Sequence, residues 1–180
     1  GESKWNRVGR IQGQANSPLT DFGVSQAMAI RDYLSGIFCN NEIKIYTSPL
    51  ERAIKTAEII SQGISVTRRE IIIEERLNDF NLGEISGIIG WDRVGEVFPK
   101  QAKLRLQNPM LFHPLGGESG KEFDARIRTL INEMMIDDKT KILVSHGIVN
   151  KFIRGIFKNL SGKEIIDLGE SQNIIYRLEN

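Results

Sequence analysis

The chain has 180 residues, of which 40% are hydrophobic and 26% are charged, and its formal net charge is +1. A chain of this size and composition buries enough apolar surface to fold without disulfide or metal support, which excludes a disordered protein. The 24 basic residues barely outnumber the 23 acidic ones, so the basic excess usual in duplex nucleic-acid binders is absent and no nucleic-acid partner is expected.

Nothing in the sequence predicts a membrane or secreted protein. Apolar runs such as Ile71–Ile73 and Ile142–Val144 are far too short to span a bilayer, and the N-terminus lacks the pattern of a signal peptide. The lone Cys39 cannot form an internal disulfide, which is typical of a reducing compartment. We therefore expect a cytoplasmic protein, with residues 1–180 forming a single domain because neither repeats nor linkers interrupt the chain.

Hydrophobic periodicity predicts helices and strands in alternation. The first helix begins at a Thr20 cap, continues to about Phe38 and carries apolar residues at helical spacing. The later elements, in chain order, are a strand over 43–47, a helix started by Ser48 and Pro49 and ending near Ser61, a strand over 64–73, short helical pieces around 91–97 and 101–106 within a lid-like stretch from 77 to 114, a helix over 118–136, a strand over 141–145, a helix over 148–157 and a strand over 173–178. Long helices between strands imply parallel pairing, so the expected fold is α/β: a three-layer α/β/α sandwich with a mostly parallel central sheet.

Two candidate side chains follow predicted strands, at the carboxyl edge where parallel sheets bind ligands. His146 ends one strand, and Gly147 after it lets a ligand approach the backbone at a helix N-terminus that favours anions. Arg52 lies in the first turns of the helix after another strand, and its guanidinium suits phosphate oxygens. Each has an ordinary alternative: a histidine bonded to a neighbouring loop, and a solvated arginine paired with Glu51 or Glu58.

Two polar stretches add further candidates. Glu2, Asn6, Gln12 and Gly13 belong to a polar segment before the first helix, which is either a substrate-gripping loop or a frayed terminus. Asp79 lies in a turn-rich stretch between apolar residues, where it is either a site carboxylate or an ordinary turn residue.

Taken together, these pieces form a series of motifs that resembles the histidine phosphatase (phosphoglycerate mutase-like) superfamily. The motifs are GESKWN at 1–6, RIQG at 10–13, SPLT at 17–20, TSPLERA at 47–53, LND at 77–79 with Gly83 and Gly87, GGES at 116–119 and VSHG at 144–147. Each is weak alone, and their order and spacing over 1–147 make the resemblance strong.

The resemblance implies a site and a mechanism. In this family an Arg-His-Gly triplet ends the first central strand, and its histidine accepts the phosphoryl group. Gly1 matches the glycine of the triplet, so the nucleophile and that strand are expected upstream of Gly1. Arg52 and His146 match the phosphate-pocket arginine and the second histidine, and Asp79 aligns with the acid that protonates the leaving alcohol. The other expected substrate- or phosphate-binding residues are Glu2, Asn6, Gln12, Gly13 and Gly147.

Asp79 is a departure from the family pattern, because many members carry Glu there. Aspartate is one methylene shorter, and its ordinary pKa is about 3.9 rather than about 4.3. Burial and a bound phosphate would raise the pKa of Asp79 while Arg52 would lower it, so the sequence leaves the balance open. Glu75 and Glu84 are the rival acids.

The short insertion over 88–115 is a second departure, because it lacks the tandem arginine pair of the mutases. The expected activity is therefore that of a histidine acid-type phosphatase, a phosphomonoester hydrolase that acts through phosphohistidine on a small phosphorylated metabolite. A cofactor-dependent phosphoglycerate mutase is one alternative, and a catalytically inactive phosphate-binding regulatory protein is the other. We expect no metal and no cofactor, since His113, His146 and Cys39 are not paired at metal-binding spacing, and a monomer or homodimer.

Overall fold

The computed structural model describes residues 1–38, 43–64, 70–136 and 139–179. The strands within these ranges are β1 (Lys44–Thr47), β2 (Ile71–Ile73) and β3 (Lys141–Val144). The α-helices are α1 (Lys4–Arg7), α2 (Asp21–Ser35), α3 (Glu51–Ser61), α4 (Trp91–Val97), α5 (Pro99–Gln107), α6 (Gly120–Met134), α7 (Gly147–Phe157) and α8 (Gly162–Asp167). Short 3-10 turns lie at η2 (Glu75–Leu77), η3 (Gly83–Ile85) and η4 (Pro109–Leu111).

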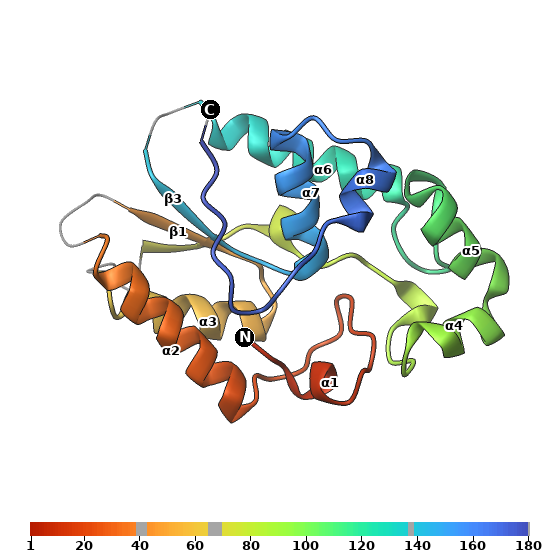
Figure 1. Ribbon diagram of the computed structural model, residues 1–180, viewed down its shortest axis with the longest axis horizontal. Coiled ribbons are helices and arrows are strands. Elements are labelled where there is room, and N and C mark those ends of the chain that lie inside the picture. Colours follow the sequence, from red (N-terminus) through yellow and green to blue (C-terminus); the bar gives the residue numbers. More distant parts are fainter. Residues whose placement is uncertain (39–42, 65–69, 137–138, 180) are drawn as a thin grey trace.

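The three strands form one parallel sheet in the order β2-β1-β3. Ile45 of β1 is opposite Ile71 of β2 on one side and Ile142 of β3 on the other. Helices α2 and α3 cover one face of this sheet, and α6 and α7 cover the other (Figure 1). The predicted α/β/α layering with a parallel central sheet is confirmed.

Alternate side chains of the strands pack into two cores on opposite faces of the sheet. Ile45 and Val144 pack beside Leu34 of α2, whereas Tyr46 and Leu143 face the opposite core. This alternation is the period-2 geometry of a strand. All three strands run the same way, so their carboxyl ends meet at one edge between the two helical layers.

The helix ends follow the predicted caps in part. The Thr20 hydroxyl accepts a hydrogen bond from the Gly23 amide at 3.0 Å and caps α2, which ends at Ser35, three residues earlier than expected. The predicted Ser48 cap is wrong, because α3 begins only at Glu51. The Ser48 side chain is instead directed to the edge of the sheet, as described below.

Two strand predictions are corrected. Residues 65–69 of the strand expected over 64–73 lie outside the described residues, as does Cys39, and β2 covers only Ile71–Ile73. The segment 173–178 is not a strand, and its alternating pattern leaves Ile174 and Ile175 about half exposed. Alternation alone does not make a strand, because the backbone also needs a partner edge for its hydrogen bonds. Helices α1 and α8, neither of which was predicted, are short polar turns closed by capping boxes.

The lid-like stretch forms helical pieces close to those predicted, with α4 and α5 at one end of the molecule (Figure 1). Ile85, Val94 and Phe112 of this stretch are buried in the same core as α6 and α7. The stretch therefore packs against the helices α6 and α7.

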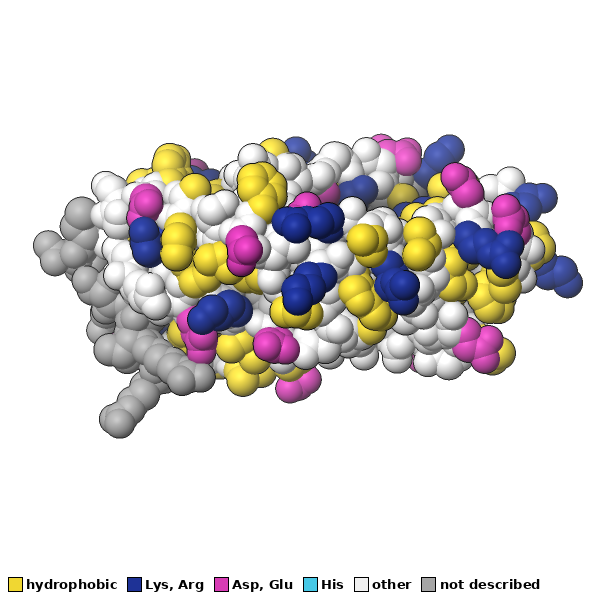
Figure 2. Space-filling model, turned by 90° about the horizontal axis from the view of Figure 1, so that it is seen from below, with side chains coloured by type: hydrophobic (Ala, Val, Ile, Leu, Met, Phe, Trp, Pro, Cys, Tyr) yellow, Lys and Arg dark blue, Asp and Glu magenta, His cyan; other side chains and the backbone are white. Residues whose placement is uncertain are grey.

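Charged side chains of both signs are mixed with apolar ones on the face shown in Figure 2, in keeping with the net charge of +1. None of the helices in the described residues has the length and apolar content that a bilayer crossing requires. The single-domain expectation stays a prediction.

Candidate active site

Arg52 is fixed at the carboxyl edge of the sheet by three hydrogen bonds. It lies in the first turn of α3 and is only 7% exposed. Its Nη1 donates to the Ala15 carbonyl at 2.8 Å, and its Nη2 donates to the Gly13 carbonyl at 2.8 Å and to Asp79 Oδ2 at 3.0 Å. Gly13 has φ +52°, and a Cβ there would meet the Phe80 carbonyl at 2.8 Å, so this turn requires glycine. The pairing of Arg52 with Glu51 or Glu58 is not what the structure shows.

His146 is the second residue after β3 and the N-cap residue of α7. Its Nε2 lies 2.7 Å from Ser48 Oγ, and its Nδ1 lies 3.7 Å from Asp79 Oδ2. Ser48 Oγ accepts a hydrogen bond from the Leu50 amide at 3.3 Å, so its proton is available for His146 Nε2. We infer from this network that Nδ1 carries the imidazole proton and faces Asp79.

Asp79 lies between the other two groups, and its side chain is 15% exposed. Oδ1 accepts a hydrogen bond from the Phe80 amide at 2.9 Å, while Oδ2 faces Arg52 and His146. A negatively charged oxygen therefore sits between a guanidinium and an imidazole that come from two neighbouring strand ends.

The backbone of Asp79 is held from both sides. Its carbonyl accepts hydrogen bonds from Arg126 Nη2 at 3.1 Å and from Gln14 Nε2 at 3.0 Å. The next residue, Phe80, stacks on the ring of Phe123 with centroids 4.8 Å apart. Arg126 also pairs with Glu118 at 2.8 Å, which ties α6 to this loop. The carboxylate is thus positioned by buried packing as well as by polar contacts.

Burial changes the ionisation of the site. It raises the pKa of Asp79 to about 6, even though the positive charges of Arg52 and Arg126 act against this rise. It lowers the pKa of His146 well below the ordinary value, and the charges of Arg52 and Arg126 lower this pKa further. At neutral pH His146 is neutral, and Asp79 titrates near physiological pH.

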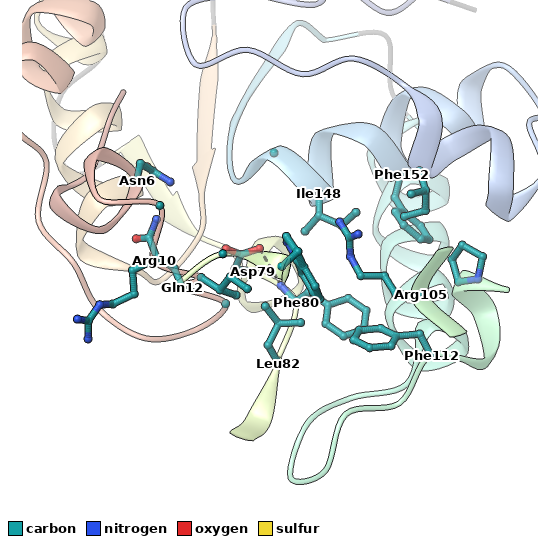
Figure 3. Close-up of a pocket in the computed structure, with 18 residues that line it drawn as sticks. Asn6, Arg10, Gln12, Asp79, Phe80, Leu82, Arg105, Phe112, Ile148 and Phe152 are labelled. Atoms are coloured by element: carbon teal, nitrogen blue, oxygen red, sulfur yellow. Dashed lines mark hydrogen bonds between the residues drawn. The ribbon is translucent and has the colours of Figure 1, made fainter. Parts of the chain in front are cut away.

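A cavity of about 400 Å³ opens beside these groups (Figure 3). Its wall includes Asn6, Gln12 and Gly13 from the N-terminal segment, Asp79, and Gly147 at the start of α7. The rest of the wall is largely apolar and aromatic, with Phe80, Trp91, Phe112, Ile148 and Phe152. This volume and mixture are typical of a site for a small organic ligand.

The structure brings most of the predicted residues together. Arg52 and His146 lie behind Asp79 rather than in the cavity wall itself. Glu2 lies apart, because its carboxylate accepts a hydrogen bond from Thr20 at 2.8 Å and pairs with Arg7 at 3.0 Å. The assigned role of each residue stays a prediction.

Sequence reasoning missed Ser48, Arg126 and Arg105 as site residues. Ser48 follows β1 directly, and that position at a strand end was a usable signal. Arg126 and Arg105 gave no signal, because a helical arginine that faces inward has the same sequence pattern as one that faces solvent. Glu75 and Glu84, the rival acids, are exposed and do not line the cavity.

Comparisons with known proteins agree with this geometry. The 2,3-bisphosphoglycerate-dependent phosphoglycerate mutase of Bartonella tribocorum is 29% identical over 182 residues, covering 98% of this chain and 87% of that protein. Phosphoserine phosphatase 1 of Hydrogenobacter thermophilus is 30% identical over 149 residues, covering 82% of this chain and 67% of that protein. The solved structure of Bacillus stearothermophilus YhfR superposes with a TM-score of 0.81 at 30% identity, covering 94% of this chain and 82% of that one.

A family model matches residues 1–179, almost the whole of the described chain. Both the order of the motifs and the meeting of Arg52, Asp79 and His146 at one sheet edge are thereby accounted for, and the chain belongs to branch 1 of the histidine phosphatase superfamily.

Proposed function

We propose that this protein is a phosphomonoesterase that transfers the phosphoryl group of a small phosphorylated metabolite to a histidine and then to water. The observation that carries the proposal is the position of Asp79 Oδ2, which is 3.0 Å from Arg52 Nη2 and 3.7 Å from His146 Nδ1. An anionic oxygen is already held there, and a phosphoryl oxygen has the same charge and the same acceptor character.

The proposed nucleophile is the histidine that the family triplet places directly before Gly1. The backbone nitrogen of Gly1, to which this histidine would be bonded, lies near the imidazole of His146. Gly1 also packs on the Gly23 backbone so closely that a Cβ would meet the Gly23 carbonyl at 2.1 Å. Gly1 is therefore held against the first turn of α2.

In the proposed first step, the nucleophilic imidazole attacks phosphorus and the ester P–O bond breaks. Arg52, the Nδ1 proton of His146 and the Gly147 amide stabilise the phosphoryl oxygens, with Asn6 as a further donor. The leaving oxygen takes its proton from Asp79, whose pKa of about 6 suits a general acid near neutral pH. Water then attacks phosphorus and gives a proton to the Asp79 carboxylate, the P–N bond breaks, and phosphate leaves.

Substrate binding itself supports this role for Asp79. A phosphate dianion beside the carboxyl disfavours its ionised form and raises its pKa further, so the acid is protonated when the ester is bound. In the free enzyme Asp79 is protonated below about pH 6, so kcat/KM is highest there. This pH dependence is the acid-type behaviour included in the proposal.

The cytoplasmic location is part of the same proposal and rests on the single cysteine of the chain.

The test uses full-length protein produced from its gene. Phosphate release is measured with p-nitrophenyl phosphate, O-phosphoserine and 3-phosphoglycerate, and mass spectrometry locates any phosphohistidine. His146→Asn abolishes release, whereas His113→Asn, the same change at the exposed second histidine of the chain, leaves it intact. Isomerisation of 3-phosphoglycerate without phosphate release would instead establish a mutase. Absence of both reactions would establish the inactive phosphate-binding protein.

A further inference from the structure

Two arginines line the cavity itself, Arg10 and Arg105, and Arg105 lies on the side of Phe112 (Figure 3). Arg105 of α5 lines the same cavity as Asp79 and Gly147. Its guanidinium lies over the Trp91 ring, with Cζ 3.8 Å from the ring centroid. Figure 3 shows this side chain turned into the cavity, whereas Arg10 extends away from it.

Arg105 has no anionic partner among the described residues, and the same is true of Arg10, which also lines the cavity and lies over the Trp5 ring. Arg52 pairs with Asp79, Arg126 with Glu118 and Arg154 with Glu170, each through an N–O distance of 3.0 Å or less. For Arg105, neither an ion pair nor a hydrogen bond is formed within the described part of the chain. Its donors are therefore free to bind a ligand.

The surroundings of Arg105 favour an anion. Burial lowers the pKa of nearby Lys151 and the charge of Arg105 lowers it further, while Lys151 Nζ donates to the Ile166 carbonyl at 2.8 Å. Burial also lowers the pKa of Arg105 itself, although a guanidinium remains charged in a protein. Phe112 and Phe152 make this end of the cavity apolar, which strengthens any charge pair formed there.

We propose that Arg105, stacked on Trp91, binds a carboxylate carried by the leaving group of the substrate and thereby selects phosphomonoesters of carboxylate-bearing alcohols. This inference rests on the proposed function, because the phosphoryl end of the substrate is placed by that site. A carboxylate matches the planar fork of a single guanidinium. A second phosphate would need more cations at one place, and of the two arginines that line the cavity only Arg105 is turned into it (Figure 3).

The test compares two substrates that differ in one group. O-phosphoserine carries the carboxylate, and O-phosphoethanolamine is the same molecule without it. In full-length protein, Arg105→Gln lowers kcat/KM for phosphoserine by about 10- to 100-fold, as expected for a charged hydrogen-bonded pair, and changes it for phosphoethanolamine by less than about twofold. Lys103→Gln, the matched loss of an exposed charge on the same helix, changes neither value.

Equilibrium binding gives a second readout that does not require turnover. Calorimetric titration of the unaltered protein shows tighter binding of phosphoserine than of phosphoethanolamine, and Arg105→Gln removes the difference. Equal affinities in the unaltered protein, or equal losses for both compounds in Arg105→Gln, would overturn the inference. Absence of turnover with both compounds contradicts the proposed function instead, and the binding difference still decides the role of Arg105.

Discussion

Arg52, behind Asp79, and Arg105, in the cavity wall, are held in opposite ways. At the end proposed for phosphate, Arg52 is 7% exposed and gives its donors to two backbone carbonyls and Asp79. At the far end, Arg105 rests on the ring of Trp91 and is unpaired within the described residues. The phosphoryl group is common to every substrate of such a site, whereas the alcohol varies. A fixed arginine suits the constant group, and an adaptable one suits the variable group.

The largest expected effect comes from removing the fixed arginine. Arg52→Ala lowers kcat/KM by about 10³-fold or more for phosphoserine and phosphoethanolamine alike, because the charge that stabilises the transferring phosphoryl group is lost. It also leaves the Gly13 and Ala15 carbonyls without their donor, so urea unfolding shows a loss of about 2–4 kcal/mol. Lys55→Ala, on the exposed side of the same helix, serves as the control. If kcat/KM fell by different factors for the two substrates, Arg52 would also contact the leaving group, and the assignment of Arg52 to the phosphoryl group alone would be wrong.

Asp79→Asn tests the proton donor. With phosphoserine, whose alkoxide needs a proton, kcat falls by about 10²- to 10³-fold, and the loss with p-nitrophenyl phosphate is smaller because p-nitrophenolate leaves unaided. Only the protonated form of Asp79 is active, so kcat/KM of the unaltered protein decreases as pH rises through about 6, the pKa in the free enzyme. In Asp79→Asn this decrease disappears.

The rival acids supply the controls for this change. Glu75→Gln and Glu84→Gln, each exposed, retain full activity and the same pH dependence. If kcat of either variant falls as far as that of Asp79→Asn, the glutamate replaced in that variant, and not Asp79, is the proton donor.

Arg126 is a positioning residue, and its removal has a moderate effect. Arg126→Gln releases the Asp79 carbonyl and unpairs Glu118, so kcat falls by about tenfold while KM changes little. A purely structural role would not move the pH midpoint. Since the charge of Arg126 lowers the pKa of Asp79, its loss raises this pKa and moves the midpoint of the kcat/KM profile upward. Arg126→Lys retains the positive charge and is expected to restore the midpoint, and a midpoint that stays constant in all three proteins would contradict the prediction.

The smallest expected effect is at the far end of the cavity. Trp91→Leu removes the ring beneath Arg105, which lowers kcat/KM for phosphoserine about two- to fivefold, the value of a cation–π contact. The value for phosphoethanolamine stays the same. Val97→Ala, at the exposed end of the same helix, is the control for the packing of α4. An equal loss with both substrates would show that Trp91 only maintains the shape of the cavity.

How far the sequence predicts this molecule differs from element to element. The Thr20 cap predicted the start of α2, and the apolar spacing predicted α6 to within two residues at each end. Both signals are local, because caps and period-3.6 patterns depend only on residues nearby in sequence. The strand expected over 173–178 failed, because strand formation depends on a partner edge that local patterns do not report. Ser48 shows the same limit. Its pattern suits a helix cap, and only the neighbouring strand end turns it toward His146.

The linear order of residues was enough to determine the family, the layered α/β plan and the candidates Arg52, Asp79 and His146, because these depend on short motifs and on strand ends that share one edge. The folded chain decided the rest. The ionisation of Asp79 depends on how deeply it is buried and on charges from α3 and α6, which are far apart in sequence. The orientation of Arg105 also depends on tertiary structure. Only when α5 packs beside α4 does its guanidinium lie over Trp91 and line the cavity, without an acidic partner among the described residues.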